Sequence, residues 1–228
     1  YGYVRSTDTL YALSNDGRTS AGPLVGALTL AVFEAAEAYA TSVGGRLPVP
    51  MVGLLDEAAN ICRFKDLDSK YSYYGSFGIV MVTVLQSWDQ GEEIWGKHGM
   101  EKLWSAANVR IYGGAVSDHR FLQRLSDLVG PYEHRTGSVS YNTHDAFKRN
   151  RTHSVTERPV LTVADLGALP PGRAVVFASR TRPALVKVRP WFDQKVLRPR
   201  VEASLAQHAP RAETAPLAGQ VTHQLDGG

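Results

Sequence analysis

Short apolar runs alternate with helix-like segments along most of the chain, and this rhythm predicts a mixed α/β fold. The runs MVGLL from residue 51 and GIVMVTVLQ from residue 78 are nearly continuous in apolar residues, which is typical of parallel strands covered by helices on both faces. Further strands are expected at DTLYALS from residue 8, NVRIYGGA from 108, RAVVFAS from 173 and ALVKVRP from 184. We therefore expect a mostly parallel sheet with helices on both faces.

The helix signals lie between these strands. A helix is expected to begin near Pro23, whose fixed φ suits a first turn, and to continue toward Tyr39. The segments EKLWSAA from residue 101 and DHRFLQRLSDLVG from 118 have helical spacing, and Gly130 is a plausible stop for the second. The second segment places its apolar residues on one face: Phe121, Leu122, Leu125 and Leu128.

Two stretches lack this periodicity. Residues 132–158 are rich in Ser, Thr, Asn, His and Arg, and a polar excursion of this length is expected to be a functional or disordered loop. Residues 196–228 have little apolar content and are expected to form a disordered polar tail. The predicted organisation is one domain over residues 1–195, including the excursion, followed by the tail.

Composition narrows the class of protein without naming a function. A chain of 228 residues with 43% hydrophobic and 21% charged residues is neither disordered nor fibrous. The net charge of +3 and a pI of about 9.0 permit an anionic partner without requiring one. Cys62 is the only cysteine, which excludes an intrachain disulfide and fits a reducing compartment. The apolar run 21–33 is shorter than the roughly 20 residues that span a bilayer, so we expect no transmembrane segment in the chain.

The candidate chemistry lies where the second strand ends, in VPMVGLLDEAANI, residues 49–61. Burying an unpaired carboxylate costs several kcal/mol, so Asp56 and Glu57 belong at an exposed strand end or at a site. An apolar strand ending in Asp-Glu resembles the Walker B element, in which one carboxylate holds Mg²⁺ through water and the other orients or deprotonates the attacking water. Capping of the following helix is an equally good interpretation of the pair alone.

Gln86 ends the next strand, and ligands bind at the carboxyl ends of parallel strands. A glutamine there could sense a γ-phosphate or place a water, although such residues also serve as simple strand-end hydrogen bonders. The segment GEEIWGKH, residues 91–98, imitates a phosphate loop but has His98 where Ser or Thr should bind Mg²⁺, and it carries acidic and bulky residues. We therefore identify no phosphate loop in this chain.

The order of four longer segments carries a resemblance: LLDEAANI, FGIVMVTVLQSWDQ, GKHGMEKLWSAANVRIYGGAVSDHRFLQRLSDLVGPYE and RPVLTVADLGALPPGRAVVFASRTRPALVKVRPWF. Together they resemble the C-terminal half of the motor domain in the TraG/TraD family of type IV secretion coupling proteins, from about Thr9 to Phe192. The resemblance implies a RecA-like domain, here a partial one without its phosphate loop. The part from about Leu103 to Leu169 resembles the family's recognition region for accessory proteins.

By the same resemblance, the parent is a membrane-anchored, ring-forming ATPase at the cytoplasmic face of the bacterial membrane. It would bind ATP and Mg²⁺, assemble as a homo-oligomeric ring (a hexamer) and deliver DNA or relaxase-bound DNA to a type IV secretion channel. Asp56 and Glu57 match the Walker B acids, and Gln86 matches the polar residue that ends the following strand. Some members place an arginine before that strand to act on a neighbour's nucleotide, whereas SKYSYYGSFGI here offers only Lys70.

Other interpretations stay open at this stage. The chain could be a binding module that docks accessory or substrate proteins without hydrolysis. It could also be a metal-dependent hydrolase, for which Asp118 and Asp127 are the downstream acids on suitable segments. Residues 179–200 contain seven Lys or Arg against one Asp, which suggests either a solvated basic strand or a DNA-facing surface. The scattered histidines lack the spacing of a transition-metal site.

Overall fold

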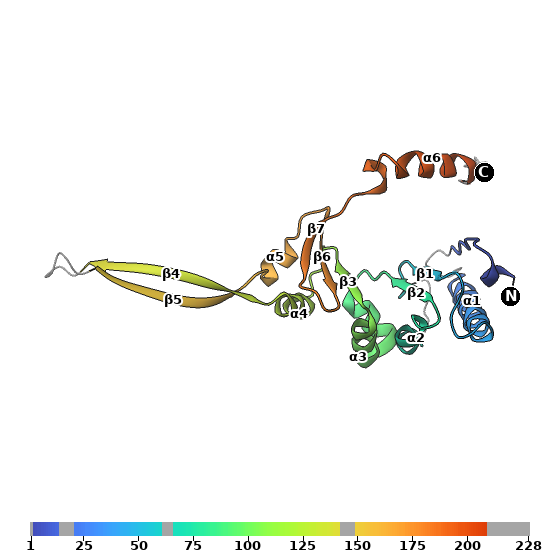
Figure 1. The fold of residues 1–228 in the computed structure, drawn as a ribbon, viewed down its shortest axis with the longest axis horizontal. Helices are drawn as coiled ribbons and strands as arrows, with labels where there is room; N and C mark the ends of the chain where they lie inside the picture. Colours follow the sequence, from blue (N-terminus) through green and yellow to red (C-terminus); the bar gives the residue numbers. More distant parts are fainter. Residues whose placement is uncertain (1, 14–20, 61–65, 142–148, 209–228) are drawn as a thin grey trace, which may run out of the picture. The chain divides into compact units, whose positions relative to one another are not determined.

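The computed structural model describes residues 2–13, 21–60, 66–141 and 149–208 (Figure 1), so that Cys62 lies outside the described residues. The chain divides into two compact units, Tyr1–Val186 and Lys187–Gly228. The elements are η1 (Tyr3–Arg5), α1 (Gly22–Ser42), β1 (Met51–Leu55), α2 (Leu67–Tyr74), β2 (Ile79–Thr83), α3 (Trp88–Ala106), β3 (Val109–Tyr112), α4 (His119–Val129), β4 (Pro131–Tyr141), β5 (Arg149–Pro159), α5 (Val163–Gly167), β6 (Arg173–Ala178), β7 (Ala184–Lys187), η2 (Trp191–Asp193) and α6 (Leu197–His208).

The first core of the larger unit is built on a parallel pair of strands. β1 pairs with β2 in the register Met51↔Ile79 to Leu55↔Thr83. Helices α1, α2 and α3 contribute buried side chains to this core, among them Phe33, Tyr74 and Trp95. Gly53 is required at the centre of β1, since a Cβ there would lie 2.5 Å from the Phe33 ring.

The opposite face of this pair is open. Its apolar side chains are 41–66% exposed: Val52, Leu54, Val80 and Val82. The sequence predicted strands covered on both faces, and the residues that the structure describes cover one face. The described helices that pack on the pair, α1, α2 and α3, all lie on the face that belongs to the first core. Burial of this apolar face would be favourable in water, by about 25 cal/mol per Å².

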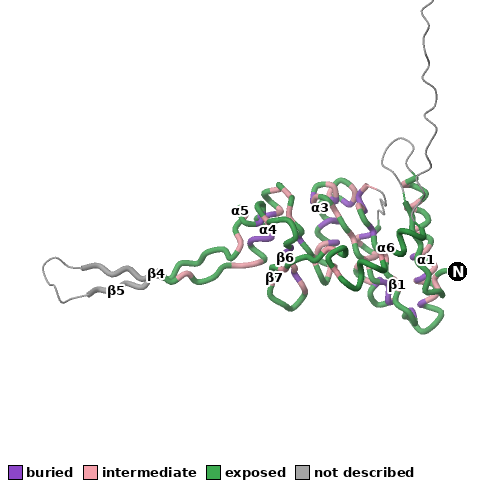
Figure 2. Tube along the Cα trace, turned by 90° about the horizontal axis from the view of Figure 1, so that it is seen from above, coloured by how far each residue is buried: buried purple, intermediate pink, exposed green. Residues whose placement is uncertain are grey.

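The second core of the same unit surrounds an antiparallel sheet. The strand order is β3-β6-β7, and β3 runs antiparallel to β6. Buried residues of α4 and α5, coloured purple in Figure 2, pack against one face of this sheet, including Leu122, Leu125 and Leu166. Gly130 ends α4 with φ 84°, as the sequence predicted. A capping box begins α5, where hydrogen bonds from Thr162 lower the pKa of Asp165.

The mixed α/β class is thus confirmed. The parallel sheet is small, with two strands, because the predicted strands from 108, 173 and 184 form the separate antiparallel sheet. Periodicity identifies strands but does not carry their direction, which depends on the connections between them.

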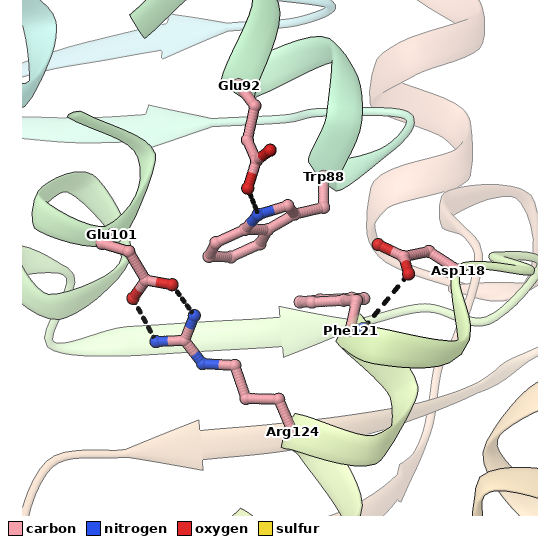
Figure 3. Close-up of polar contacts among 6 residues, drawn as sticks. All are labelled: Trp88, Glu92, Glu101, Asp118, Phe121 and Arg124. Carbon is pink, nitrogen blue, oxygen red and sulfur yellow. Dashed lines mark hydrogen bonds and ion pairs between the residues drawn. The ribbon is translucent and has the colours of Figure 1, made fainter. Parts of the chain in front are cut away.

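A cluster of aromatic rings joins the two cores. Trp104 and Phe121 pack against both sets of buried residues. The Trp88 ring stacks on Phe121, with ring centroids 5.3 Å apart. Figure 3 shows how α3 and α4 are also tied by Arg124, which donates to both carboxylate oxygens of Glu101 at 2.5 and 2.6 Å. The guanidinium carbon of Arg124 lies 4.9 Å from the centre of the Trp88 ring.

The polar excursion is an antiparallel hairpin rather than the expected loop. β4 and β5 pair from Pro131↔Pro159 to Tyr141↔Arg149, and together they form a sheet of two strands. Residues 142–148 lie outside the description. Alternating Ser, Thr and charged residues obscure the strand pattern here, because a ribbon with few apolar side chains has no buried face to mark its period.

Three further expectations, all near the ends of the chain, differ from the structure. Residues 8–13 form neither helix nor strand, so the predicted first strand is wrong over its described part. Residues 197–208 form α6, where a disordered tail was expected, and residues 209–228 lie outside the description. Helix α1 continues to Ser42, so on length and composition alone it could cross a membrane, contrary to the estimate from residues 21–33. Soluble core helices meet the same criteria, and Phe33, Ala36 and Ala40 of α1 are buried in the first core.

Two glycine substitutions test the packing of α1 on β1. Gly53→Ala should lower the free energy of unfolding by about 1–3 kcal/mol, because the added methyl group meets the buried Phe33 ring. Gly26→Ala is the matched control, since no heavy atom lies within 4 Å of the added Cβ in α1. It should raise the free energy of unfolding by about 0.5–1 kcal/mol through helix propensity. Urea titration of both variants measures the difference, and equal effects would contradict the proposed contact.

Candidate functional site at the ends of the parallel strands

The parallel register brings the residues that follow β1 and β2 to one edge of the sheet. Leu55 and Thr83 are partners at the ends of the two strands. The backbone pairing continues past them, since Val84 N–H donates to the Leu55 carbonyl at 2.9 Å and Ala58 N–H donates to the Val84 carbonyl at 3.2 Å. The segments that carry the predicted site residues are therefore held together by main-chain hydrogen bonds.

Glu57 and Gln86 meet at this edge. The Gln86 Nε2 donates to Glu57 Oε1 at 2.6 Å, although the two residues are 29 positions apart in sequence. Glu57 has φ 48°, in the left-handed region that costs a non-glycine residue about 1–2 kcal/mol. Strain of this kind is often found at functional sites, where the surrounding structure maintains it. The structure thus brings together two of the residues predicted from sequence, while their roles stay predictions.

Asp56 lies beside this pair and is exposed. It makes no hydrogen bond or ion pair with another residue in the part of the chain that the structure describes. The first described helix after the pair, α2, begins at Leu67 with Asp66 at its N-cap. Capping of α2 therefore does not account for Asp56 or Glu57. Asp56 is left with a free carboxylate at a strand end, which suits a hydrated Mg²⁺ ion.

A cleft of about 250 Å³ opens next to Gln86. Gln86, Ser87 and Asp89 line one side, and the loop from Ala115 to Asp118 lines the other. Ala115, which lines this cleft, has φ 61°, in the left-handed region. Sequence reasoning missed the loop residues. The pair Gly113-Gly114 just before them was the available signal, since adjacent glycines often mark a special turn.

The downstream acids do not complete a metal-hydrolase site. Asp118 Oδ1 accepts from the backbone N–H groups of Arg120 and Phe121, so it caps α4. Asp127 accepts from Gln123 Nε2 at 2.8 Å, and it lines a different groove along α4. Among the described residues no group of three His, Cys, Asp or Glu could hold a metal ion. This arrangement does not favour the hydrolase interpretation.

The apparent phosphate loop lies inside a helix. Residues 91–98 belong to α3, whose course is interrupted at Gly96 with φ 69°. A phosphate loop must instead follow a strand and present bare backbone amides. The rejection of GEEIWGKH made from sequence is therefore supported by its place in α3.

The predicted cations occupy exposed or paired positions. Lys70 lies 3.8 Å from Glu37 on α1. Burial opposes its charge, but a hydrogen bond with Tyr73 and the carboxylates of Glu37 and Glu34 raise the pKa of Lys70 above its ordinary value. In the smaller unit, Arg198 pairs with Glu202, whereas Lys187, Arg189 and Lys195 are exposed beside the exposed rings of Trp191 and Phe192. The DNA-facing role of residues 179–200 therefore stays a prediction.

Comparisons with known proteins agree with the resemblance. The family described as "TraM recognition site of TraD and TraG" matches residues 50–171. Similar solved structures include the bacterial conjugative coupling protein TrwBdeltaN70 in an unbound form, with 21% identity and a TM-score of 0.53, and in a form with sulphate, with 21% identity and a TM-score of 0.55. The plasmid coupling protein TrwB in complex with ADP and Mg²⁺ has 20% identity and a TM-score of 0.53. The matches cover 74% of this chain and 37–38% of those chains. No curated protein matches the chain.

The strained backbone of Glu57 gives a stability test. Glu57→Gly removes the left-handed strain and the hydrogen bond from Gln86, whereas Glu57→Ala removes the hydrogen bond alone. The glycine variant should therefore be more stable than the alanine variant by about 1 kcal/mol. Chemical denaturation compares the two variants directly. Equal stabilities would mean that Glu57 does not hold this conformation.

Proposed function

This chain belongs to the family of the TraM recognition site of TraD and TraG, and we propose that it is part of an ATP-driven coupling protein of conjugation. In this proposal the complete protein delivers DNA or relaxase-bound DNA to a type IV secretion channel. The chain spans 37–38% of the TrwB structures that it matches, so it represents one portion of such a motor. The single observation that carries the proposal is the contact of Glu57 with Gln86 at the ends of adjacent parallel strands.

The arrangement at the sheet edge suits the Walker B roles. Asp56 has an exposed carboxylate without a hydrogen-bond partner in the described chain, and it would hold Mg²⁺ through water. Bound Mg²⁺ would neutralise charge on the phosphates of ATP. Glu57 would orient or deprotonate the attacking water, and Gln86 would keep the Glu57 carboxylate in place while sensing the nucleotide. The phosphate loop would come from another segment of the complete protein.

The open face of the parallel pair supports the same proposal. Val52, Leu54, Val80 and Val82 form an exposed apolar surface that a single soluble chain would normally cover. A RecA-like domain places further elements on both faces of its sheet. We therefore assign this face to a segment of the complete motor domain, the same part that would supply the phosphate loop.

The proposed partners follow from the family. They are DNA or a relaxase–DNA complex, components of the secretion channel, and an accessory protein of the TraM type. A homo-oligomeric ring, a hexamer by family resemblance, would assemble at the cytoplasmic face of the membrane. The arginine finger is not assigned, since Lys70 is engaged with Glu37 in this chain.

Glu57→Gln in the full-length parent tests the catalytic assignment. The variant should bind ATP with Mg²⁺ as the parent does and should lose turnover by about 10²-fold or more, because the amide cannot accept a proton. Glu93→Gln is the matched control, since Glu93 is an exposed carboxylate on α3 and its loss should leave turnover unchanged. Rapid-quench hydrolysis and nucleotide binding separate the two effects. Parental turnover in Glu57→Gln would remove Glu57 from the mechanism.

A non-hydrolysing docking module is the second candidate. The family description as a recognition site favours it, as does the lack of a phosphate loop in this chain. The Glu57→Gln experiment distinguishes the candidates, because a pure docking role predicts no nucleotide-dependent change in the parent. Partner binding should be unaffected by the substitution under either candidate.

The basic segment provides a test of DNA binding. Replacing Lys187, Arg189 and Lys195 by Ala should weaken DNA binding and should reduce the slope of log K against log salt by about 0.7–0.9 for each phosphate that the variant no longer neutralises. A control variant with Lys97, Arg120 and Arg173 replaced removes equal charge from exposed positions elsewhere. Fluorescence anisotropy over a salt series measures both slopes. If the two variants reduced the slope equally, the basic segment would have no special role.

A further inference from the structure

The β4–β5 hairpin has open edges. In the described part of the chain its two strands pair only with each other, over 11 residues each. The described side chains of residues 131–135 and 155–159 are exposed or half-buried, and Tyr132 and Val155 are 46% and 57% exposed. An isolated two-stranded ribbon is only marginally stable in water. Such an element gains most from a further strand or layer.

One hydrogen bond at the base of the ribbon shows which amides of β4 point toward β5 and which point away from it. Val160 N–H donates to the Gly130 carbonyl at 3.1 Å, so these opposite residues form a hydrogen-bonded pair. Pairs alternate along an antiparallel ladder, and the register then places the even-numbered residues of β4 toward β5. The odd-numbered residues present their N–H and C=O groups to the outer edge: Glu133, Arg135, Gly137, Val139 and Tyr141.

The prolines agree with this assignment. Pro131 and Pro159 are opposite each other at odd-numbered positions, where no N–H is needed for the ladder. They protect the base of the ribbon, since proline cannot donate to an added strand. Beyond Arg135, β4 reads TGSVSY, with neither a charged residue nor a proline. Natural edges are usually defended by such residues, and residues 136–141 of this edge have none.

We propose that the outer edge of β4 is a docking site for one extended strand of a TraM-type accessory protein. This inference rests on the proposed function, which supplies the partner. β4 and β5 lie wholly within the residues matched by the recognition-site family. Strand addition would use the outward amides for affinity and neighbouring side chains for specificity.

Charge favours a polypeptide over a nucleic acid at this edge. β4 contains one acid and one base, Glu133 and Arg135, and these lie 3.6 Å apart as an ion pair. The partner strand β5 carries the excess positive charge of the ribbon, with Arg149, Arg151 and Arg158 against Glu157. The β4 strand itself has no net charge with which to attract a polyanion to its outer edge. An extended polypeptide needs only the main-chain groups that the edge presents.

Proline substitution at an outward position tests whether the accessory protein binds through main-chain hydrogen bonds to β4. Val139→Pro removes an outward N–H and leaves the β5-facing amides intact, so the ribbon should persist while affinity for the accessory protein falls about tenfold or more. Val139→Ala keeps the N–H and should bind within about twofold of the parent chain. Arg135→Pro and Arg135→Ala form a second matched pair, in case the first proline disturbs the ribbon. Isothermal titration of the full-length parent with the TraM-type protein of the same conjugative element measures each affinity.

Amide hydrogen exchange supplies an independent pattern. In the chain alone, the outward amides of β4 should exchange faster than the inward amides of His134, Thr136 and Ser138. Addition of the accessory protein should slow the outward amides selectively. Protection of the outward amides in the chain alone, rising with its concentration, would instead identify a second copy as the occupant and overturn the proposal.

The possible outcomes test the accessory partner and the β4 edge separately. No binding by the parent chain would overturn the accessory partner and, with it, the β4 docking site. Binding by the parent chain with equal affinity for the Pro and Ala variants would overturn the β4 edge while leaving the partner in place. Selective loss of affinity in the Pro variants, with retained inward protection, would support both.

Discussion

The packing of Trp88, Trp104 and Phe121 holds the larger unit together. The parallel pair and the antiparallel sheet have separate cores, and Trp104 and Phe121 are packed against both. Stacked and edge-to-face rings of this kind contribute about 0.5–1.5 kcal/mol per pair beyond their burial. Arg124 adds an ion pair with Glu101 and lies over the Trp88 ring, so the join is both apolar and electrostatic. Because Trp88 follows Gln86 by two positions, the same cluster positions the start of α3 beside the candidate site.

The fold could be predicted wherever an element buries one face, because burial gives its apolar residues a regular spacing in the sequence. β1, β2, β6 and α4 were all evident from their apolar residues, because each has one face in a core. Strand direction could not be predicted, since β3 and β6 look the same in sequence whether parallel or antiparallel. The hairpin was missed for the opposite reason, because β4 and β5 have little apolar content to reveal an alternation. Propensity alone is a weak guide in such a ribbon.

The sequence could predict that Glu57 and Gln86 lie at strand ends, but it could not predict the geometry around them. Glu57 and Gln86 could be placed at strand ends from the apolar runs before them, and parallel pairing then brings them together. The left-handed backbone at Glu57 and the Ala115 loop depend on tertiary contacts that no local pattern carries. Asp118 shows a further limit of sequence reasoning. Its carboxylate was a plausible metal ligand in the sequence, but in the structure it caps α4.

Gly96 divides α3 into two shorter rods. Its φ of 69° breaks the run of helical backbone, and no heavy atom lies within 4 Å of where a Cβ would be. Backbone conformation, rather than crowding, is therefore what requires glycine there. The rod before Gly96 begins beside Gln86, while the rod after it carries Glu101 and Trp104 toward α4. Trp88 and Trp95 before this joint and Met100 and Leu103 after it are buried in the same first core, so the break at Gly96 redirects α3 while both of its parts stay packed against one core.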